Sequence, residues 1–171
     1  MKTALRSRLP FLLLALWLVS CGPSTKNESA EIELQLTGEM LFEGANTLQF
    51  AGENQLKEVS DQLGVEINAI KNVSVSDAVL KLEDSSKEIT ESLLLQLVSD
   101  NNELITIGTL SPLPDGNNMS LSLAENTSIL SYLNDSGLTW VLDLNIKEDH
   151  MDEMIVTGKI DLTVDYIPTN N

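Results

Sequence analysis

A strict alternation of apolar and polar residues near the C-terminus constrains the fold most. From Val156 to Tyr166, every second residue is apolar or glycine, and the residues between them are Thr, Lys or Asp. A period of two places alternate side chains on opposite faces of an extended chain, so this segment predicts a β-strand with one buried face. Residues 31–37 and 142–147 alternate in the same way, and Trp140 continues the apolar phase of the second segment. Such strands need neighbours that cover their apolar faces, so the chain is expected to fold around a sheet.

Shorter patterns predict the remaining elements. Apolar positions indicate further strands at 73–82, 93–98, 104–110 and 119–123. The polar residues 99–103 predict a hairpin turn between two of these strands. Asn54 and Gly64 flank apolar residues at helical spacing, which predicts a short helix with these two residues as its caps. A second short helix is expected at 129–133, ended by Gly137.

This element order predicts the fold class. About seven strands with two short helices in connections, and no strand–helix–strand repeat, are typical of a mainly β fold. We expect a two-sheet antiparallel sandwich, immunoglobulin-like or similar, although no Cys pair surrounds Trp140 as in antibody domains. A single domain is expected over residues 31–167, followed by a C-terminal tail at 168–171.

The N-terminus predicts export. Lys2, Arg6 and Arg8 precede an apolar run over residues 9–19, which Pro10 interrupts. A charged start followed by a short apolar core is typical of a secretory signal peptide, and we place it at residues 1–20. The run is about half as long as the roughly 20 residues that a membrane-spanning helix needs, so a permanent span is not expected.

The four residues Leu18, Val19, Ser20 and Cys21 resemble the lipobox of bacterial lipoproteins. The resemblance implies that a diacylglycerol joins the Cys21 thiol, that the signal is cut before this residue, and that the new amine is acylated, for example with palmitate. A glycerolipid buries enough methylenes to hold a small domain on a membrane. The next residue is Gly22, and in the enterobacterial sorting pattern the lack of Asp there favours the outer membrane. The expected location is therefore the cell envelope, with the outer membrane favoured.

Composition restricts the partners. Residues 21–30 are polar without an apolar period and predict a flexible tether behind the lipidated Cys21. Cutting the signal removes three cations and leaves 7 Lys, no Arg and 26 acidic residues, a net charge of −19. This balance argues against nucleic acid, whose affinity comes mainly from basic patches. It also argues against adsorption on anionic lipid, so we expect the lipid alone to hold the domain on the membrane.

Candidate catalytic residues are few. His150 is the only histidine and lies among carboxylates at residues 148–153. A zinc site usually has a second nitrogen or sulfur ligand, so an exposed turn is the expected setting of His150. With Cys21 used as the anchor, no thiol remains for a disulfide, a metal or a nucleophile. The chain contains no G-x-S-x-G, P-loop or G-x-G-x-x-G motif. We therefore expect no catalytic residues, no metal site and no cofactor.

Two further features bear on binding. The loops at 100–103, 115–118 and 148–153 carry oxygen ligands that suit calcium, but none has the EF-hand spacing, and hairpin turns favour these residue types anyway. Weak or diffuse calcium binding is the expectation.

The aromatic residues after the signal are Phe42, Phe50, Tyr132, Trp140 and Tyr166. Most of them lie on core-facing phases, which argues against a sugar-binding platform.

The order of four segments resembles the small β-sandwich lipoproteins of Bacteroidetes. The segments are NVSVSDAVLKLED (72–84), YLNDSG (132–137), WVLDLNIKED (140–149) and IVTGKIDLTVDY (155–166). The resemblance implies a fold and a location, and no catalytic residues. The expected function is a non-enzymatic interaction or structural module with a protein partner in the envelope. The alternative is a carrier of a small or apolar ligand in a cavity between the sheets, and an enzyme ranks third.

Overall fold

The structure is a computed structural model that describes residues 24–116, 118–125 and 128–168. Its strands are β1 (Lys26–Gly38), β2 (Gly44–Ala51), β3 (Ile70–Leu82), β4 (Thr90–Ser99), β5 (Asn102–Leu110), β6 (Met119–Ser120), β7 (Ser122–Leu123), β8 (Thr139–Ile146) and β9 (Met154–Tyr166). Three α-helices and a 3-10 helix lie in the connections: α1 (Gln55–Leu63), η1 (Ile67–Ala69), α2 (Asp84–Ile89) and α3 (Leu130–Leu133). The mainly β prediction is confirmed.

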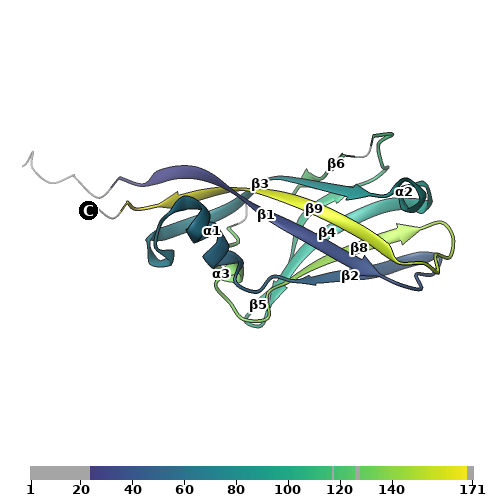
Figure 1. Cartoon of the computed structure of the whole chain (residues 1–171), viewed down its shortest axis with the longest axis horizontal. Coiled ribbons are helices and arrows are strands. Elements are labelled where there is room, and N and C mark those ends of the chain that lie inside the picture. The colour runs from purple at the N-terminus through teal and green to yellow at the C-terminus, as the bar shows by residue number, and fades with distance from the viewer. Residues whose placement is uncertain (1–23, 117, 126–127, 169–171) are drawn as a thin grey trace, which may run out of the picture.

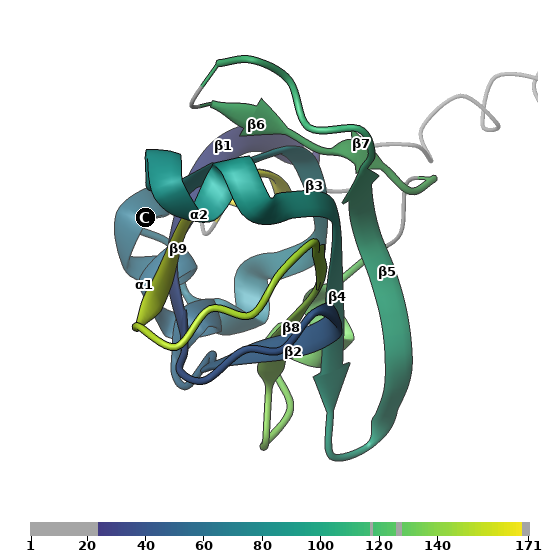
Figure 2. The same cartoon turned by 90° about the vertical axis from the view of Figure 1, so that its right-hand side faces the viewer.

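The strands form one antiparallel sheet in the order β6-β3-β9-β1-β2-β8-β4-β5-β7. The two edge strands belong to one short segment, since β6 pairs with β3 through Met119 and Leu80, while β7 pairs with β5 through Leu123 and Gly108. This segment nearly closes the sheet into a barrel-like ring (Figure 2). The expected division into two sheets of about seven strands is therefore replaced by a single sheet of nine strands.

Alternation places the core inside this ring. Ile160, Leu162 and Val164 of β9 are fully buried, which confirms the inward phase predicted for this strand. Trp140 on β8 is also 0% exposed, and its indole Nε1 donates a hydrogen bond to Oε1 of Gln55 at 2.8 Å. Because Gln55 is itself buried, this bond satisfies two polar groups that would otherwise be costly in the interior.

Two of the helices were predicted. α1 lies between Asn54 and Gly64, as expected, and both flanking residues adopt left-handed backbone conformations. The side chain of Asn54 makes no capping hydrogen bond; its carbonyl accepts the amide of Glu58 at 3.0 Å instead. α3 occupies the second expected position, whereas α2 was not predicted.

The start of β1 corrects the expected tether. Residues 26–30 are part of β1 and pair with β9, from Lys26 opposite Tyr166 to Ala30 opposite Leu162. Side chains add to this pairing, because the Tyr166 hydroxyl donates to Oε1 of Glu28 at 2.6 Å. This hydrogen bond, helped by partial burial, raises the pKa of Tyr166. The polar segment is therefore held by its backbone ladder, although it lacks an apolar period.

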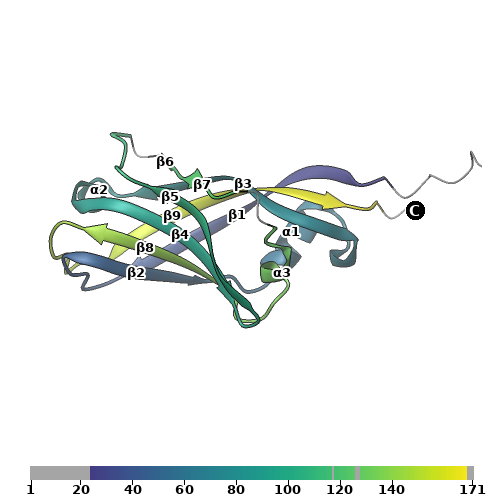
Figure 3. The same ribbon diagram turned by 180° about the vertical axis from the view of Figure 1, so that it is seen from behind.

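The described chain has two distinct ends along its long axis. The start of β1 and the end of β9 lie together at one end, beside α1 and α3 (Figures 1 and 3). The β1–β2 and β8–β9 loops lie at the opposite end, near α2 (Figure 1). β1 has 13 residues, and at about 3.3 Å per residue it separates the two ends by roughly 40 Å.

Candidate functional site

Cys21 and the predicted signal at 1–20 lie outside the described residues, so lipidation stays a prediction. Lys26 begins β1, and the five residues from Cys21 to Lys26 reach at most about 17 Å when fully extended. A lipid on Cys21 would therefore sit near the end of the domain that carries α1 and α3. Within the described ranges, no helix has the length and apolarity needed to cross a membrane.

The loop at 100–103 is held by a carboxylate that follows α3. Asp135 accepts hydrogen bonds from the Ser99 hydroxyl (2.9 Å), from the backbone and side-chain amides of Asn101 (both 2.7 Å), and from the Asn102 amide (3.0 Å). The Ser136 backbone amide adds another at 3.0 Å. The side-chain and backbone hydrogen bonds from Asn101 lower the pKa of Asp135 most, to about 2. These contacts join the β4–β5 turn to the segment before β8, which is a structural task.

Asp135 should make the stability of the fold depend on pH in the acidic range. Its folded pKa lies below the value of about 3.9 for an unfolded Asp, so its contribution is present above about pH 4 and is lost as the pH falls toward 2. Asp135→Ala should lower the melting temperature at pH 7 by several degrees and should flatten the loss of stability between pH 4 and pH 2. Thermal melts followed by circular dichroism measure both effects.

Asp115→Ala is the matched control for this prediction, because Asp115 lies on an exposed loop. It should leave the melting temperature and its acid dependence close to those of the parent chain. Equal acid dependence of the parent and Asp135→Ala would contradict the assignment of this carboxylate as a stabilising group.

The other oxygen-rich loops are also engaged in structural contacts. Oδ1 of Asp149 accepts the Glu43 amide at 2.9 Å, and the carbonyl of Gly116 accepts Nζ of Lys87 at 2.8 Å. Asn117 lies outside the described residues. Across 24–116, 118–125 and 128–168, no three His, Cys, Asp or Glu residues are grouped so as to hold a metal ion. Weak, diffuse calcium binding stays a prediction.

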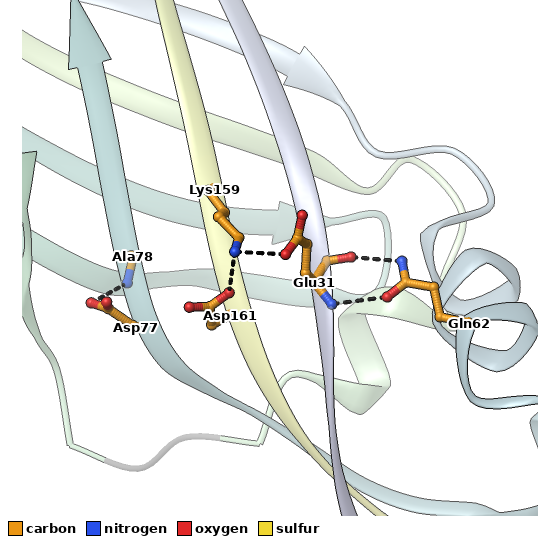
Figure 4. A network of polar contacts seen from close by, with 6 residues as sticks. All are labelled: Glu31, Gln62, Asp77, Ala78, Lys159 and Asp161. Carbon is orange, nitrogen blue, oxygen red and sulfur yellow. Dashed lines mark hydrogen bonds and ion pairs between the residues drawn. The ribbon is translucent and has the colours of Figure 1, made fainter. Parts of the chain in front are cut away.

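A charged cluster on β1 and β9 is structural as well (Figure 4). Nζ of Lys159 lies 2.7 Å from Glu31 and 3.4 Å from Asp161, and the hydrogen bond to Glu31 is the main cause of the raised pKa of Lys159. The Gln62 side chain exchanges hydrogen bonds of 3.0 and 2.8 Å with the backbone of Glu31. On β3, Asp77 accepts its neighbour's amide in the same view. The cluster therefore fastens α1 and β9 to β1.

A groove lies outside the ring, at the end where β1 begins. It has a volume of about 970 Å³ and lies between α1, η1, α3 and the start of β3. Its apolar lining includes Leu56, Ile67, Ile70 and Leu130. This position differs from the cavity between sheets that the carrier alternative expected, because fully buried side chains such as Trp140 occupy the interior.

At the opposite end, two loops are joined by a bridge between Leu41 and His150. Each residue donates its backbone amide to the carbonyl of the other, at 2.9 and 2.8 Å. Leu41 points inward and is 6% exposed. Nε2 of His150 is also buried and has no hydrogen-bond partner in the described part of the chain. The prediction of a solvated turn is therefore wrong for Nε2 of His150, whereas the neighbouring residues Asp149 and Met151 are exposed.

The residues beside this bridge form an exposed apolar surface. Met40, Phe42 and Met151 are 62%, 60% and 55% exposed, and they are three of the five large apolar side chains exposed within the described residues. Residues that flank a bridged pair lie opposite each other on adjacent segments, so these three side chains share one end of the molecule. We call Met40, Phe42 and Met151 the distal patch. Three of the five aromatic residues after the signal are buried, as expected of most of them, but Phe42 is exposed because its neighbour Leu41 occupies the inward position.

Side-chain contacts fix the backbone of the distal patch. The Phe42 amide donates to Oδ1 of Asn46 at 3.1 Å, and Nδ2 of Asn46 returns a bond of 2.7 Å to the Phe42 carbonyl. Asp149 holds Glu43, as described above, and so ties the two loops together. Met40 has a φ of 51°, in the left-handed region that non-glycine residues seldom occupy. The surrounding contacts must therefore hold a conformation that is costly for Met40.

Carboxylates surround the distal patch. The two loops carry six exposed acidic residues: Glu39, Glu43, Glu148, Asp149, Asp152 and Glu153. Lys147 is the single cation in residues 39–43 and 147–153. In the sequence, only the acidic residues could have indicated this site. The residues around 40–42 do not indicate whether the Phe42 side chain is exposed or buried.

Comparisons with known proteins leave the family open. The chain matches neither a protein-family model nor a curated protein. Among solved structures, it is similar to one of Desmodium yellow mottle tymovirus, with 9% identity and a TM-score of 0.35 over 90% of this chain and 96% of the other. It is also similar to one of turnip yellow mosaic virus, with 12% identity and a TM-score of 0.30 over 84% of this chain and 98% of the other. Likeness at this level assigns neither a family nor an activity, so the function has to rest on the chain's own residues.

Proposed function

We propose that this chain is a lipid-anchored lipoprotein of the cell envelope that works without turnover, as an interaction or structural module. The observation that carries the proposal is that the start of β1 and the distal patch lie at opposite ends of the domain. β1 begins five residues after Cys21 at one end of the domain, and the distal patch lies at the other end. An anchor through Cys21 thus leaves the distal patch free to meet a partner. Gly22 after the anchor favours the outer membrane as the location.

The charged groups support a surface function over catalysis. A catalytic site needs groups with tuned pKa values that are held in mutual geometry. In the described residues, the groups with shifted pKa values are Asp135, Lys159 and Tyr166, and each shift comes mainly from hydrogen bonds that join structural elements. Asp135 follows α3, whereas Lys159 and Tyr166 lie seven residues apart on β9. We therefore propose that binding, and not chemistry, is the task of this domain.

Cys21→Ala should abolish lipid attachment, because only the thiol can form the thioether. Cells fed an alkyne analogue of palmitate would label the parent chain and leave Cys21→Ala unlabelled and released from the membrane fraction. Phe42→Ser is the matched control, since it alters the opposite end of the domain and should label normally. A Cys21→Ala chain that still labels and stays with the membrane would refute the anchor.

A carrier of a small apolar ligand is the second candidate, and the groove beside α1 and α3 is the observation that favours it. Its volume of about 970 Å³ lies at the upper end of the range of roughly 300–1,000 Å³ for small-molecule sites. Native mass spectrometry of the lipidated protein separates the two candidates. An apolar molecule that co-purifies in fixed proportion would favour the carrier, whereas a protein without added mass beyond its lipid would favour the interaction module.

A further inference from the structure

We propose that the distal patch docks a cationic amphipathic segment of a partner protein, one that presents apolar side chains beside lysines or arginines. The inference deepens the proposed function and rests on it only for the position of the patch relative to the membrane. The binding surface itself consists of the three exposed apolar side chains, the two loops that hold them and the surrounding carboxylates.

The apolar part supplies the contact area. Exposed apolar side chains scattered singly over a surface need no explanation, but neighbouring ones mark an interaction site. Phe42 offers a rigid aromatic ring of the kind that anchors many protein interfaces. Met40 and Met151 flank it with flexible thioether side chains, which can adapt to partners of different shape. Ile67 and Leu104, the other exposed large apolar residues, lie in elements outside these two loops.

The loops are already ordered in the shape that a partner would meet. The Leu41–His150 bridge, the two hydrogen bonds between Phe42 and Asn46 and the hydrogen bond from the Glu43 amide to Asp149 fix both backbones. Binding to a surface that is ordered beforehand avoids the entropy cost of fixing loops on association. The left-handed backbone of Met40 fits the same interpretation, because strained residues concentrate at functional surfaces.

Charge selects the partner. Six carboxylates beside three apolar side chains complement a segment that carries cations beside apolar residues, and they would steer such a segment toward the patch. The same carboxylates disfavour two other occupants. A second copy of this chain would bring its own acidic loops into the contact, and the whole chain carries a net charge of −16. Anionic lipid would be repelled for the same reason.

The first test measures binding of a defined probe. The lipidated full-length protein, held in nanodiscs of phosphatidylcholine, is titrated with a fluorescent Leu/Lys peptide of about four helical turns that has one apolar face. A scrambled peptide of the same composition and a Leu/Glu peptide serve as comparisons. We expect the amphipathic Leu/Lys peptide to bind best, and the Met40→Ser/Phe42→Ser double variant to weaken its affinity about tenfold, the loss of a modest hot spot. Ile67→Ser and Leu104→Ser, which remove exposed apolar side chains elsewhere, should change the affinity little.

A second pair of variants separates local from diffuse attraction. Glu39→Gln with Asp152→Gln removes two charges beside the patch. Glu53→Gln with Glu103→Gln removes two exposed charges elsewhere, one from the loop before α1 and one from β5. Only the first pair should weaken binding of the Leu/Lys peptide clearly. Equal effects of both pairs would show attraction to the overall negative charge, and would overturn the proposal.

Other outcomes also decide the question. No preference for the amphipathic peptide over the scrambled one overturns the proposal. So does bridging of phosphatidylcholine vesicles by the lipidated protein in a manner that Phe42→Ser abolishes, since that would make the patch a membrane contact. A dimer that Phe42→Ser disrupts would make the occupant a second copy. If Cys21→Ala still labels while the peptide binds as expected, the anchor is wrong and the docking surface stands.

Discussion

Replacing Trp140 by alanine is expected to lower the free energy of unfolding by about 3–5 kcal/mol, as for other buried aromatic residues. Trp140 is fully buried on β8, opposite Phe50 of β2 and Leu97 of β4, so it contributes to the contact between three strands. Its loss would leave a cavity in the ring and would remove the donor that satisfies Gln55. Urea unfolding of the full chain, followed by circular dichroism, measures the change.

The two parts of this effect can be separated. Trp140→Phe keeps much of the apolar volume but leaves Oε1 of Gln55 buried without its donor, which should cost about 1–3 kcal/mol beyond the lost volume. Gln55→Met in the Trp140→Phe background removes that orphaned acceptor and should recover part of the stability. A double-mutant cycle then gives the coupling between the two positions. A coupling near zero would mean that the indole–amide hydrogen bond contributes nothing measurable, against this expectation.

Alternation explains which strands could be predicted from the sequence. β9 buries every second residue and was predicted with its facing residues. β4 buries alternate residues from Leu93 onward, and β8 does so from Leu142 onward. β5 was predicted as the partner of β4, but its burial does not alternate, since Ile107 and Gly108 are both buried. β2 was missed, because only Leu48 among its eight residues is buried and the polar residues around it indicate a turn. α2 was missed for a similar reason, since it has six residues and Ile89 is the single buried apolar residue among them.

The closure of the sheet could not be predicted from periodicity. A period of two shows that a strand has one buried face, and this is equally true of a two-sheet sandwich and of a closed ring. A two-sheet sandwich and a closed ring differ in which strands pair with each other. In this chain, the pairing that closes the ring depends on five residues. Residues 119–123 meet β3 through Met119 and β5 through Leu123, and neither contact has a local signal in the sequence.

The same limit applies to the candidate site and to the tether. The distal patch exists because Leu41 pairs with His150, a contact between residues far apart in the chain. The apolar side chain of Phe42 by itself suggests burial. Only the bridge shows that Leu41, and not Phe42, takes the inward position. Residues 26–30 are polar and resemble a linker by composition, yet β9 supplies hydrogen-bond partners for their backbone. Polar segments become strands when a neighbouring edge is open to them.

Met119→Asp is expected to open the ring at the segment that closes it. Met119 is fully buried and faces Leu80 of β3, which is also fully buried. Truncation of such a methionine alone costs about 2–5 kcal/mol, and a carboxylate in its place adds the cost of burying an unpaired charge. The segment can avoid that cost by leaving the sheet, because β6 and β7 have only two residues each. Local opening should therefore precede global unfolding.

Hydrogen exchange at two amides tests this directly. The Leu121 amide donates to the carbonyl of Ala78 and the Ala124 amide to that of Ile107, both at 2.9 Å, so each reports on one side of the closing segment. Both should lose protection in Met119→Asp while the amides shared by β8 and β4 keep theirs. Ser120→Asp is the control. Ser120 follows Met119 directly and is exposed, so a carboxylate there should leave exchange unchanged. Loss of protection in all strands together would show that closure is inseparable from the fold. Unchanged exchange at Leu121 and Ala124 would show that the segment tolerates the charge and that Met119 does not hold the ring closed.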